Sequence, residues 1–293
     1  MDAPSIITLT SDFGLSDPYV AAMKGVILSI DPAVTIVDVT HDIRPQQVEE
    51  AVFLLEAAAP YFPEGTVHVV VVDPGVGTER RALAVASPAG YFVGPDNGVL
   101  AVALPETARV AGEVALPDGM RAVAIEPERL GRGEISMTFH GRDVFAPAAA
   151  HLALGVRVET LGEPVRSLVS LPPFRAKRDA GGALAGRVVH VDRFGNLVTD
   201  VRASDLARGA VSVEIAGRRI DGLSATYGAE KGRLVALIDS SGYLEIAVTQ
   251  GSAADMLEAH IGTAVGVRDG RVRGQGRPVP RRASPRRPPA TTR

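Results

Sequence analysis

The sequence has no cysteine and no long apolar run, and each absence excludes a class of protein. Without cysteine there is no disulfide framework, no thiolate metal site and no thiol nucleophile, and a cytoplasmic location is the default expectation. No stretch approaches the roughly 18 apolar residues that a membrane span needs, so we expect no membrane partner. The first residues, MDAPS, form neither a basic nor an apolar segment, so no secretory signal is expected.

Several cofactor motifs are also missing. The sequence has no phosphate-binding loop, no GxGxxG fingerprint after its first predicted strand and no GxSxG nucleophile elbow. His151, His190 and His260 share no spacing with acidic residues that suggests a metal site. We therefore expect neither a metal nor a cofactor.

Charge is distributed unevenly along the chain. The net charge is −3, but residues 271–293 contain eight arginines and no acid, which leaves −11 for residues 1–270. Residues 269–293 are rich in proline and arginine and have almost no large apolar side chain, so they predict a disordered basic tail. The acidic remainder argues against nucleic-acid binding as the main role.

The first half of the chain alternates apolar runs with helical patterns. Strands are predicted over 6–10, 34–39 and 67–72, and helices over 18–30, 48–59 and 142–154. Strand–helix alternation is typical of a parallel sheet covered by helices on both faces. Residues 1–165 therefore predict an α/β domain with a mostly parallel sheet.

The second half has a different pattern. A proline-rich stretch over 162–175 predicts a connector between two domains. Beyond it, short β-type runs separated by glycine turns lie at 186–191, 211–215, 233–238, 243–248 and 263–267. This spacing predicts a small β-barrel domain over 175–268.

Polar residues follow the predicted strands at the edge where open α/β sheets bind ligands. Asp73 ends the valine run in VVVVDPGVGTERR, and Asp12 follows the first strand in TSDFGLSD. A carboxylate at a strand tip can accept hydrogen bonds from both hydroxyls of a ribose. His140, in TFHGRD, suits a general base near neutral pH, and Arg80 can bind a carboxylate through two parallel hydrogen bonds.

Each of these residues, taken alone, also fits a structural role. Asp12 fits a loop position, and Asp17 fits an N-cap of the first helix. Asp73 fits a plain turn, Arg80 a surface cation and His140 a loop histidine. The VDRFGNLVTD segment fits a routine turn between two β runs.

Seven motifs together resemble one known family. They are TLTSDFG, DVTHDI, VVDPGVGT, GPDNG, TFHGRD, VDRFGN and DSSGYLEIAV, in this order over about residues 5–267. They are similar to motifs of the S-adenosyl-L-methionine (SAM) hydroxide adenosyltransferases, which are adenosine-forming SAM hydrolases related to SAM-dependent fluorinases and chlorinases. The resemblance implies an α/β domain, a β-barrel domain and a homotrimer that binds SAM between neighbouring subunits.

The resemblance also implies roles for individual residues. Asp73, Arg80 and His140 match the catalytic Asp–Arg–His triad of the hydrolase branch, whereas halogenases have Tyr-Pro at the first position and lack the other two residues. Fluorinases place a halide-binding serine where this chain has Gly141, and chlorinases can also have glycine there. Ser241 replaces an arginine that halogenases have beside the serine of DSSG. The matching substrate-binding residues are Asp12 for the ribose, Asp17, Asp192 and Ser240 for the methionine end, and Phe194 and Asn196 for the adenine.

The expected activity is attack of water on C5′ of SAM, which gives adenosine and L-methionine. His140 is expected to accept the proton, with Asp73 orienting the water and Arg80 holding Asp73 or stabilising hydroxide. Three alternatives stay open at this point. They are a halogenase that forms a 5′-halo-5′-deoxyadenosine, a SAM-binding protein with negligible turnover, and a metal-dependent hydrolase that uses Asp12, Asp73 and His140.

Overall fold

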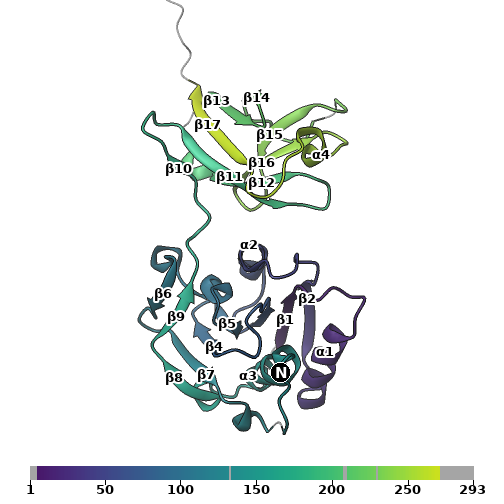
Figure 1. Ribbon diagram of the computed structural model, residues 1–293, viewed down its shortest axis with the longest axis vertical. Coiled ribbons are helices and arrows are strands. Elements are labelled where there is room, and N and C mark those ends of the chain that lie inside the picture. The colour runs from purple at the N-terminus through teal and green to yellow at the C-terminus, as the bar shows by residue number, and fades with distance from the viewer. Residues whose placement is uncertain (1–4, 132, 207–209, 229, 271–293) are drawn as a thin grey trace, which may run out of the picture.

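The computed structural model describes residues 5–131, 133–206, 210–228 and 230–270, and the expected basic tail lies almost wholly outside them. The chain forms an N-terminal α/β domain and a C-terminal β domain, joined by one extended segment (Figure 1). Both expected domain types are therefore present.

The N-terminal domain is built on a seven-stranded mixed sheet. Four neighbouring strands are parallel, and the next three are antiparallel to their neighbours. In order across the sheet, the strands are β2 Thr35–Thr40, β1 Ile6–Ser11, β3 Val67–Val71, β5 Gly90–Pro95, β4 Ala82–Ser87, β7 Arg121–Ile125 and β8 Gly162–Val165. A separate pair is formed by β6 Gly112–Ala115 and β9 Ser167–Ser170.

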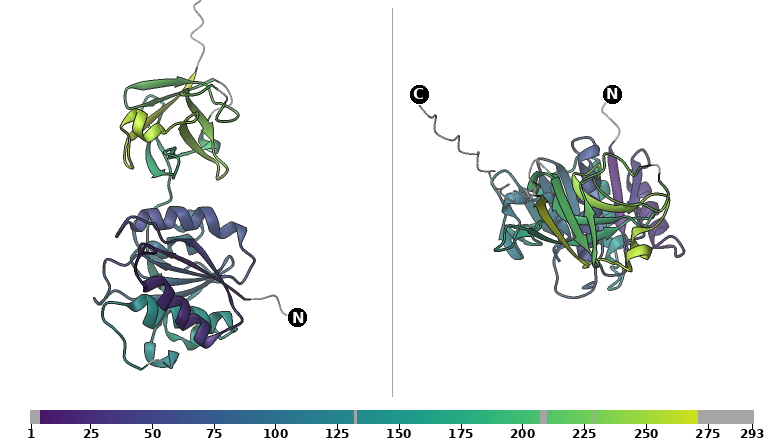
Figure 2. Two further views of the ribbon diagram at one scale, coloured as in Figure 1. Left: turned by 90° about the vertical axis from the view of Figure 1, so that its right-hand side faces the viewer. Right: turned by 90° about the horizontal axis from the view of Figure 1, so that it is seen from above.

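Helices cover both faces of this sheet (Figure 2). Helices α1 Tyr19–Ile30 and α3 Ala146–Ala153 pack together on one face, where they bury a core with β1 and β3. Helix α2 Val48–Ala58 covers the other face with the short 3₁₀ helix η2 Val99–Ala103. β3 is buried along its whole length, as its valine run predicts for a central strand.

Two segments differ from the sequence expectation. The helix expected over 142–154 begins with a π-helical turn, η5 Gly141–Phe145, and only then continues as α3. The expected connector, 162–175, contains β8 and β9. Gly162 explains the first of these strands, because a Cβ at that position would lie 1.8 Å from the carbonyl oxygen of Ala124 on β7. The glycine that suggested a loop is the residue that lets β8 approach β7.

The C-terminal domain is an antiparallel, nearly closed barrel. The two end strands, β14 and β15, contact each other, and the interior is apolar. Strands β12 and β14 have no counterpart among the expected β runs. The strands are β10 Lys177–Arg178, β11 Leu184–Val191, β12 Leu197–Arg202, β13 Ala210–Ile215, β14 Arg218–Asp221, β15 Leu234–Ile238, β16 Tyr243–Val248 and β17 Ala264–Gly270, with one short helix, α4 Ala253–Leu257.

The barrel packs on helix α2 through one aromatic side chain. The ring of Phe53 lies 5.5 Å from those of Phe174, His190 and Tyr243, measured between centroids. Arg202 adds polar contacts, at 2.7 Å to Glu106 and 3.1 Å to the Tyr243 hydroxyl. Among the described residues, no helix is long and apolar enough to cross a membrane.

Candidate active site

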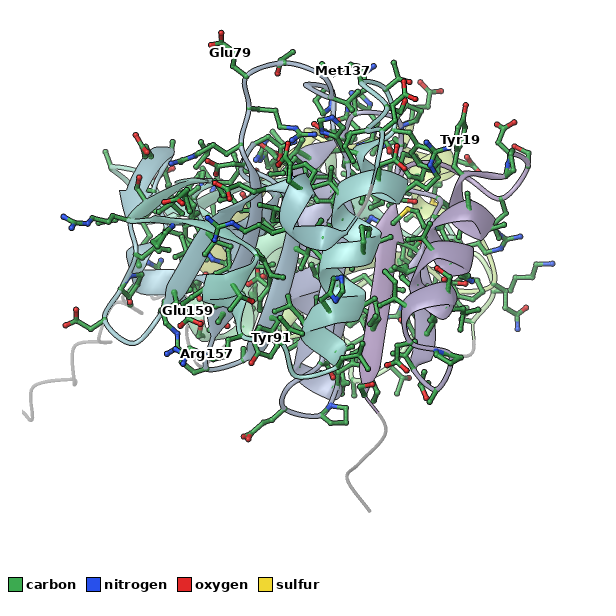
Figure 3. All side chains as sticks on the ribbon, turned by 90° about the horizontal axis from the view of Figure 1, so that it is seen from below. Tyr19, Glu79, Tyr91, Met137, Arg157 and Glu159 are labelled. Carbon is green, nitrogen blue, oxygen red and sulfur yellow. The ribbon has the colours of Figure 1, made fainter. Side chains whose placement is uncertain are left out.

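Three loops meet at the carboxyl edge of the parallel strands. In Figure 3, Glu79, Met137 and Tyr19 lie together at one edge of the sheet, whereas Tyr91, at the start of β5, lies at the opposite edge. Glu79 belongs to the loop after β3, and Tyr19 begins the helix after β1. The loop that carries Asp73 therefore lies at the edge where ligands of open α/β sheets bind.

Asp73, Arg80 and His140 are in direct contact. Arg80 Nε donates to both carboxylate oxygens of Asp73 at 3.0 Å, and Arg80 Nη2 donates to Oδ2 at 2.5 Å. The same Nη2 lies 2.7 Å from Nδ1 of His140. The planar guanidinium of Arg80 thus joins the carboxylate of Asp73, 7 residues away in sequence, to the imidazole of His140, 60 residues away.

Gly77 allows the two loops to come this close. Its φ of +77° is unfavourable for other residues, and a Cβ there would lie 2.4 Å from the carbonyl oxygen of Met137. The GVGT segment therefore brings the loop after β3 against the loop before His140.

The acid and the guanidinium of the triad are shielded from solvent, and His140 is partly buried. The side chains of Asp73 and Arg80 are 6% and 10% exposed, and the Arg80 guanidinium lies 5.4 Å from the centre of the Phe145 ring. Burial, followed by the positive charge of Arg80, lowers the pKa of His140 below its usual 6.5, although the charges of Asp73 and Asp143 oppose this. His140 is therefore held neutral at pH 7.

The loop around His140 is held by a buried carboxylate. Asp143 is 1% exposed and accepts hydrogen bonds from the backbone N–H of Ser136 and from two nitrogens of Arg142. Arg142 in turn lies over the Phe139 ring at 5.1 Å. Asp143 thus closes the turn that presents His140.

The two other acids at this edge have different environments. Asp12 Oδ2 accepts a hydrogen bond from the backbone N–H of Gln46 at 2.8 Å, which links the loops after β1 and β2. Gln46 has a φ of +68°, a strained value for a residue with a side chain. Asp17 is exposed and does not cap α1, whose N-cap is Pro18 and has no side-chain hydrogen bond. The N-cap alternative for Asp17 is therefore wrong.

The C-terminal candidates lie on turns of the barrel. Asp192 Oδ1 accepts from the backbone N–H groups of Phe194 and Asn196, and Oδ2 accepts from the Asn196 side chain. Phe194 is 76% exposed, while Asn196 is buried. Ser240 is exposed on the turn before β16 and lines, with Asp192, a cavity of about 550 Å³.

Sequence reasoning missed two groups near these residues. Phe13, Tyr19 and Phe139 form an aromatic wall beside His140, with ring centres 5.2–5.9 Å apart. Tyr227 and Glu245 line the barrel cavity with Ser240. A signal for Glu245 was present, because it is the only charged residue in the otherwise apolar run YLEIAV.

The N-terminal and C-terminal candidates line different parts of the described chain. Four well-formed cavities among the described residues include Asp192 and Ser240 in their linings but none of the triad residues. The described residues also contain no group of three or more His, Asp or Glu side chains placed to hold a metal ion. The alternative that uses Asp12, Asp73 and His140 as metal ligands therefore lacks a ligand set.

A buried Asp–Arg–His group at the edge of an α/β sheet, with polar turns on a following barrel, defines a two-domain enzyme that acts on a small molecule. Family models described as the N-terminal and C-terminal domains of SAM hydroxide adenosyltransferase match residues 7–162 and 186–266. The chain belongs to this family.

Individual relatives agree with this membership. The (R)-S-adenosyl-L-methionine hydrolase of Thermus thermophilus is 43% identical over 259 residues, or 84% of this chain and 93% of the relative. A fluorinase of an Actinoplanes species is 31% identical over 280 residues, or 83% of this chain and 90% of the relative. A crystal structure of an uncharacterized conserved protein from Thermotoga maritima, 34% identical, superposes with a TM-score of 0.79 over 89% of this chain and 99% of that one.

Proposed function

We propose that this protein hydrolyses SAM, by attack of hydroxide on the ribose C5′, to adenosine and L-methionine. The observation that carries the proposal is the contact of Arg80 with both Asp73 and His140, in a chain 43% identical to an (R)-SAM hydrolase. Because the sulfonium sulfur is already a good leaving group, the reaction needs no general acid.

The contact between Arg80 and His140 defines the role of the imidazole. A guanidinium can only donate, so Nδ1 of His140 must accept the hydrogen bond from Arg80 Nη2. The neutral ring then carries its proton on Nε2, and this nitrogen is a donor. We therefore propose that His140 donates a hydrogen bond to the nucleophile, in place of the role as proton acceptor that the sequence suggested.

In this mechanism, Arg80 and His140 stabilise hydroxide rather than abstract a proton during the attack. Hydrogen bonds donated to a bound water favour its ionised form, so the water loses its proton to solvent before the attack. Asp73 holds the guanidinium in place with three hydrogen bonds. Hydroxide then forms a bond to C5′ as the C5′–S bond breaks, and the electron pair of that bond stays on the methionine sulfur.

The substrate-binding residues are proposed in two sets. Asp12 binds the ribose hydroxyls and Asp17 the methionine end on the α/β domain. Asp192 and Ser240 bind the methionine end on the barrel, where Phe194 and Asn196 contact the adenine. Because Asp12 and Asp17 line none of the four well-formed cavities of the described residues, two of which Asp192 lines, we propose that a homotrimer completes each site from two neighbouring copies.

The activity of the relatives suggests a finer specificity. Four of them are (R)-SAM hydrolases with 33–43% identity to this chain. We propose that this protein also prefers the R epimer at the sulfonium. Turnover of the separated R and S epimers, each at saturating concentration, tests this preference.

Product analysis in ¹⁸O-labelled water tests the activity. We expect adenosine labelled at its 5′-hydroxyl, with or without added chloride or fluoride, and unlabelled methionine. A 5′-halo-5′-deoxyadenosine would instead identify a halogenase. Intact SAM bound at one molecule per site would identify a SAM-binding protein, and loss of turnover with a chelator would identify a metal-dependent enzyme.

A further inference from the structure

The cavity of about 550 Å³ on the barrel has an unusual charge. Its lining includes the carboxylates of Asp192, Asp239 and Glu245, the hydroxyls of Ser240 and Tyr227, and no lysine or arginine. An acid-lined cavity of this kind favours a positively charged group.

Glu245 is the acid of this cavity with a buried oxygen that has no hydrogen-bond partner among the described residues. It lies on the central strand β16, paired with Val198 of β12 and Leu237 of β15, and is 4% exposed. Its neighbours Leu244 and Ile246 point into the barrel core, so Glu245 points to the opposite side, toward the cavity that it lines. Its Oε1 atom accepts no hydrogen bond from any described residue.

The two other acids of this cavity are committed to turns. Both oxygens of Asp192 accept hydrogen bonds within the turn before β12. Asp239 Oδ1 accepts from the backbone N–H groups of Ser241 and Tyr243. A buried carboxylate oxygen without a donor is unfavourable, so Glu245 is the group that gains most from an incoming N–H donor.

We propose that Glu245 binds the α-ammonium group of the substrate and that this cavity recognises the ammonium but not the carboxylate of the methionine end. The inference rests on the proposed function. Burial raises the pKa of Glu245, and a hydrogen bond from the Tyr227 hydroxyl opposes this. Tyr227 is 46% exposed, so its side chain can move to admit the ammonium group in its place. The lining contains no lysine or arginine for the carboxylate, and its one imidazole, His190, already lies 3.6 Å from Glu50. Decarboxylated SAM, which keeps the amino group but has no carboxylate, is therefore also a substrate.

Three compounds and three proteins test the proposal. The compounds are SAM, decarboxylated SAM and a deaminated analogue that keeps the carboxylate. The proteins are the wild type, Glu245→Gln and the control Glu214→Gln, which alters an exposed glutamate that is paired with Arg268 on the far side of the barrel sheet. Since Gln keeps the shape of Glu245 and removes its charge, the melting temperature of Glu245→Gln should not fall.

For the wild type, we expect kcat/KM for decarboxylated SAM within about tenfold of the value for SAM, and a value at least about 100-fold lower for the deaminated analogue. Glu245→Gln should raise KM for both amino compounds about 10- to 100-fold, mostly without loss of kcat, and Glu214→Gln should change neither constant. Unchanged KM in Glu245→Gln, or a preference for the deaminated analogue, would overturn the proposal.

Failure of the proposed function would look different. The wild type would then turn over none of the three compounds, and calorimetric titration with the same compounds would still test the cavity. Binding of the two amino compounds that weakens in Glu245→Gln would support the ammonium site. Equal binding of all three compounds, or none, would refute it.

Discussion

Substitution of His140 by its two amide analogues separates a hydrogen-bond donor from a general base. A glutamine amide nitrogen can occupy the place of Nε2 and donate, but it cannot accept a proton. An asparagine oxygen can occupy the place of Nδ1 and keep the contact with Arg80, which is 2.7 Å long in the wild type, but it leaves no donor at the Nε2 position. Neither variant adds a charge to the buried site.

The expected losses follow from these contacts. A hydrogen bond to a charged group contributes about 1.5–3 kcal/mol, which corresponds to roughly 10- to 150-fold in rate. His140→Asn loses the donor to hydroxide and should fall by that factor in kcat. His140→Gln keeps the donor and should stay within about tenfold of the wild type. A general base contributes about 10²–10⁴-fold, so under that role both variants would lose activity equally and by more.

The pH profile gives a second measurement. Burial and the charge of Arg80 lower the pKa of His140, so the neutral ring persists as the pH falls through 6.5. We therefore expect that protonation of His140 causes no loss of kcat near pH 6.5, and that the wild type and His140→Gln have the same profile there. The pH dependence that both proteins keep comes from ionisation of the bound water. Stopped assays of adenosine release from pH 5 to 9 measure this. Equal, deep losses in both variants, together with a wild-type acid limb near 6.5, would refute the donor role.

Three further substitutions follow from the structure. Gly77→Ala places a Cβ 2.4 Å from the Met137 carbonyl at a φ of +77°, so kcat should fall at least about tenfold. The control Gly75→Ala, with contacts of 3.4 Å and no φ constraint, should keep the wild-type kcat. His68 is 1% exposed, and burial lowers its pKa to about 4. Because the unfolded chain binds a proton that the folded chain does not, the free energy of unfolding should fall by about 3 kcal/mol between pH 6.5 and 4. Denaturant titrations of His68→Asn should lack this slope. Gly141→Ser should give no halogenated nucleoside with SAM and chloride, because the triad remains; a halogenated product by chromatography would contradict the hydroxide site.

The local pattern predicted β1, β2 and β3 of the α/β domain because these strands are apolar runs between helical patterns, whereas β4, β5, β6 and β7 had no counterpart among the expected strands. Val67–Val71 is buried on both faces, and nothing but a central strand suits it. The barrel was harder, because β14 Arg218–Asp221 is a polar strand with one buried residue, Ile220. β12 follows a glycine and an asparagine that predict a turn, so the sequence did not indicate where this strand starts. In both strands, pairing with neighbours outweighs the local signal.

The site was predictable in its members but not in its chemistry. The motif resemblance identified Asp73, Arg80 and His140, and the structure brings them into contact. The tautomer of His140 depends on which of its nitrogens faces Arg80, and no spacing in the sequence contains that information. Glu245 stands out in the sequence as the one acid of an apolar run, but only the structure shows that its Oε1 atom is buried without a donor.

The charge of the triad suits a cationic substrate. Asp73 and Arg80 neutralise each other, and His140 is held neutral, so the three side chains carry no net charge at pH 7. A protonated imidazole would instead add a positive charge close to the sulfonium and oppose its binding. Hydroxide, once formed beside Arg80, is attracted by the sulfonium itself, and this attraction grows as desolvation removes screening. An arginine between the acid and the histidine therefore provides what a general base would provide, without placing a second cation against the substrate.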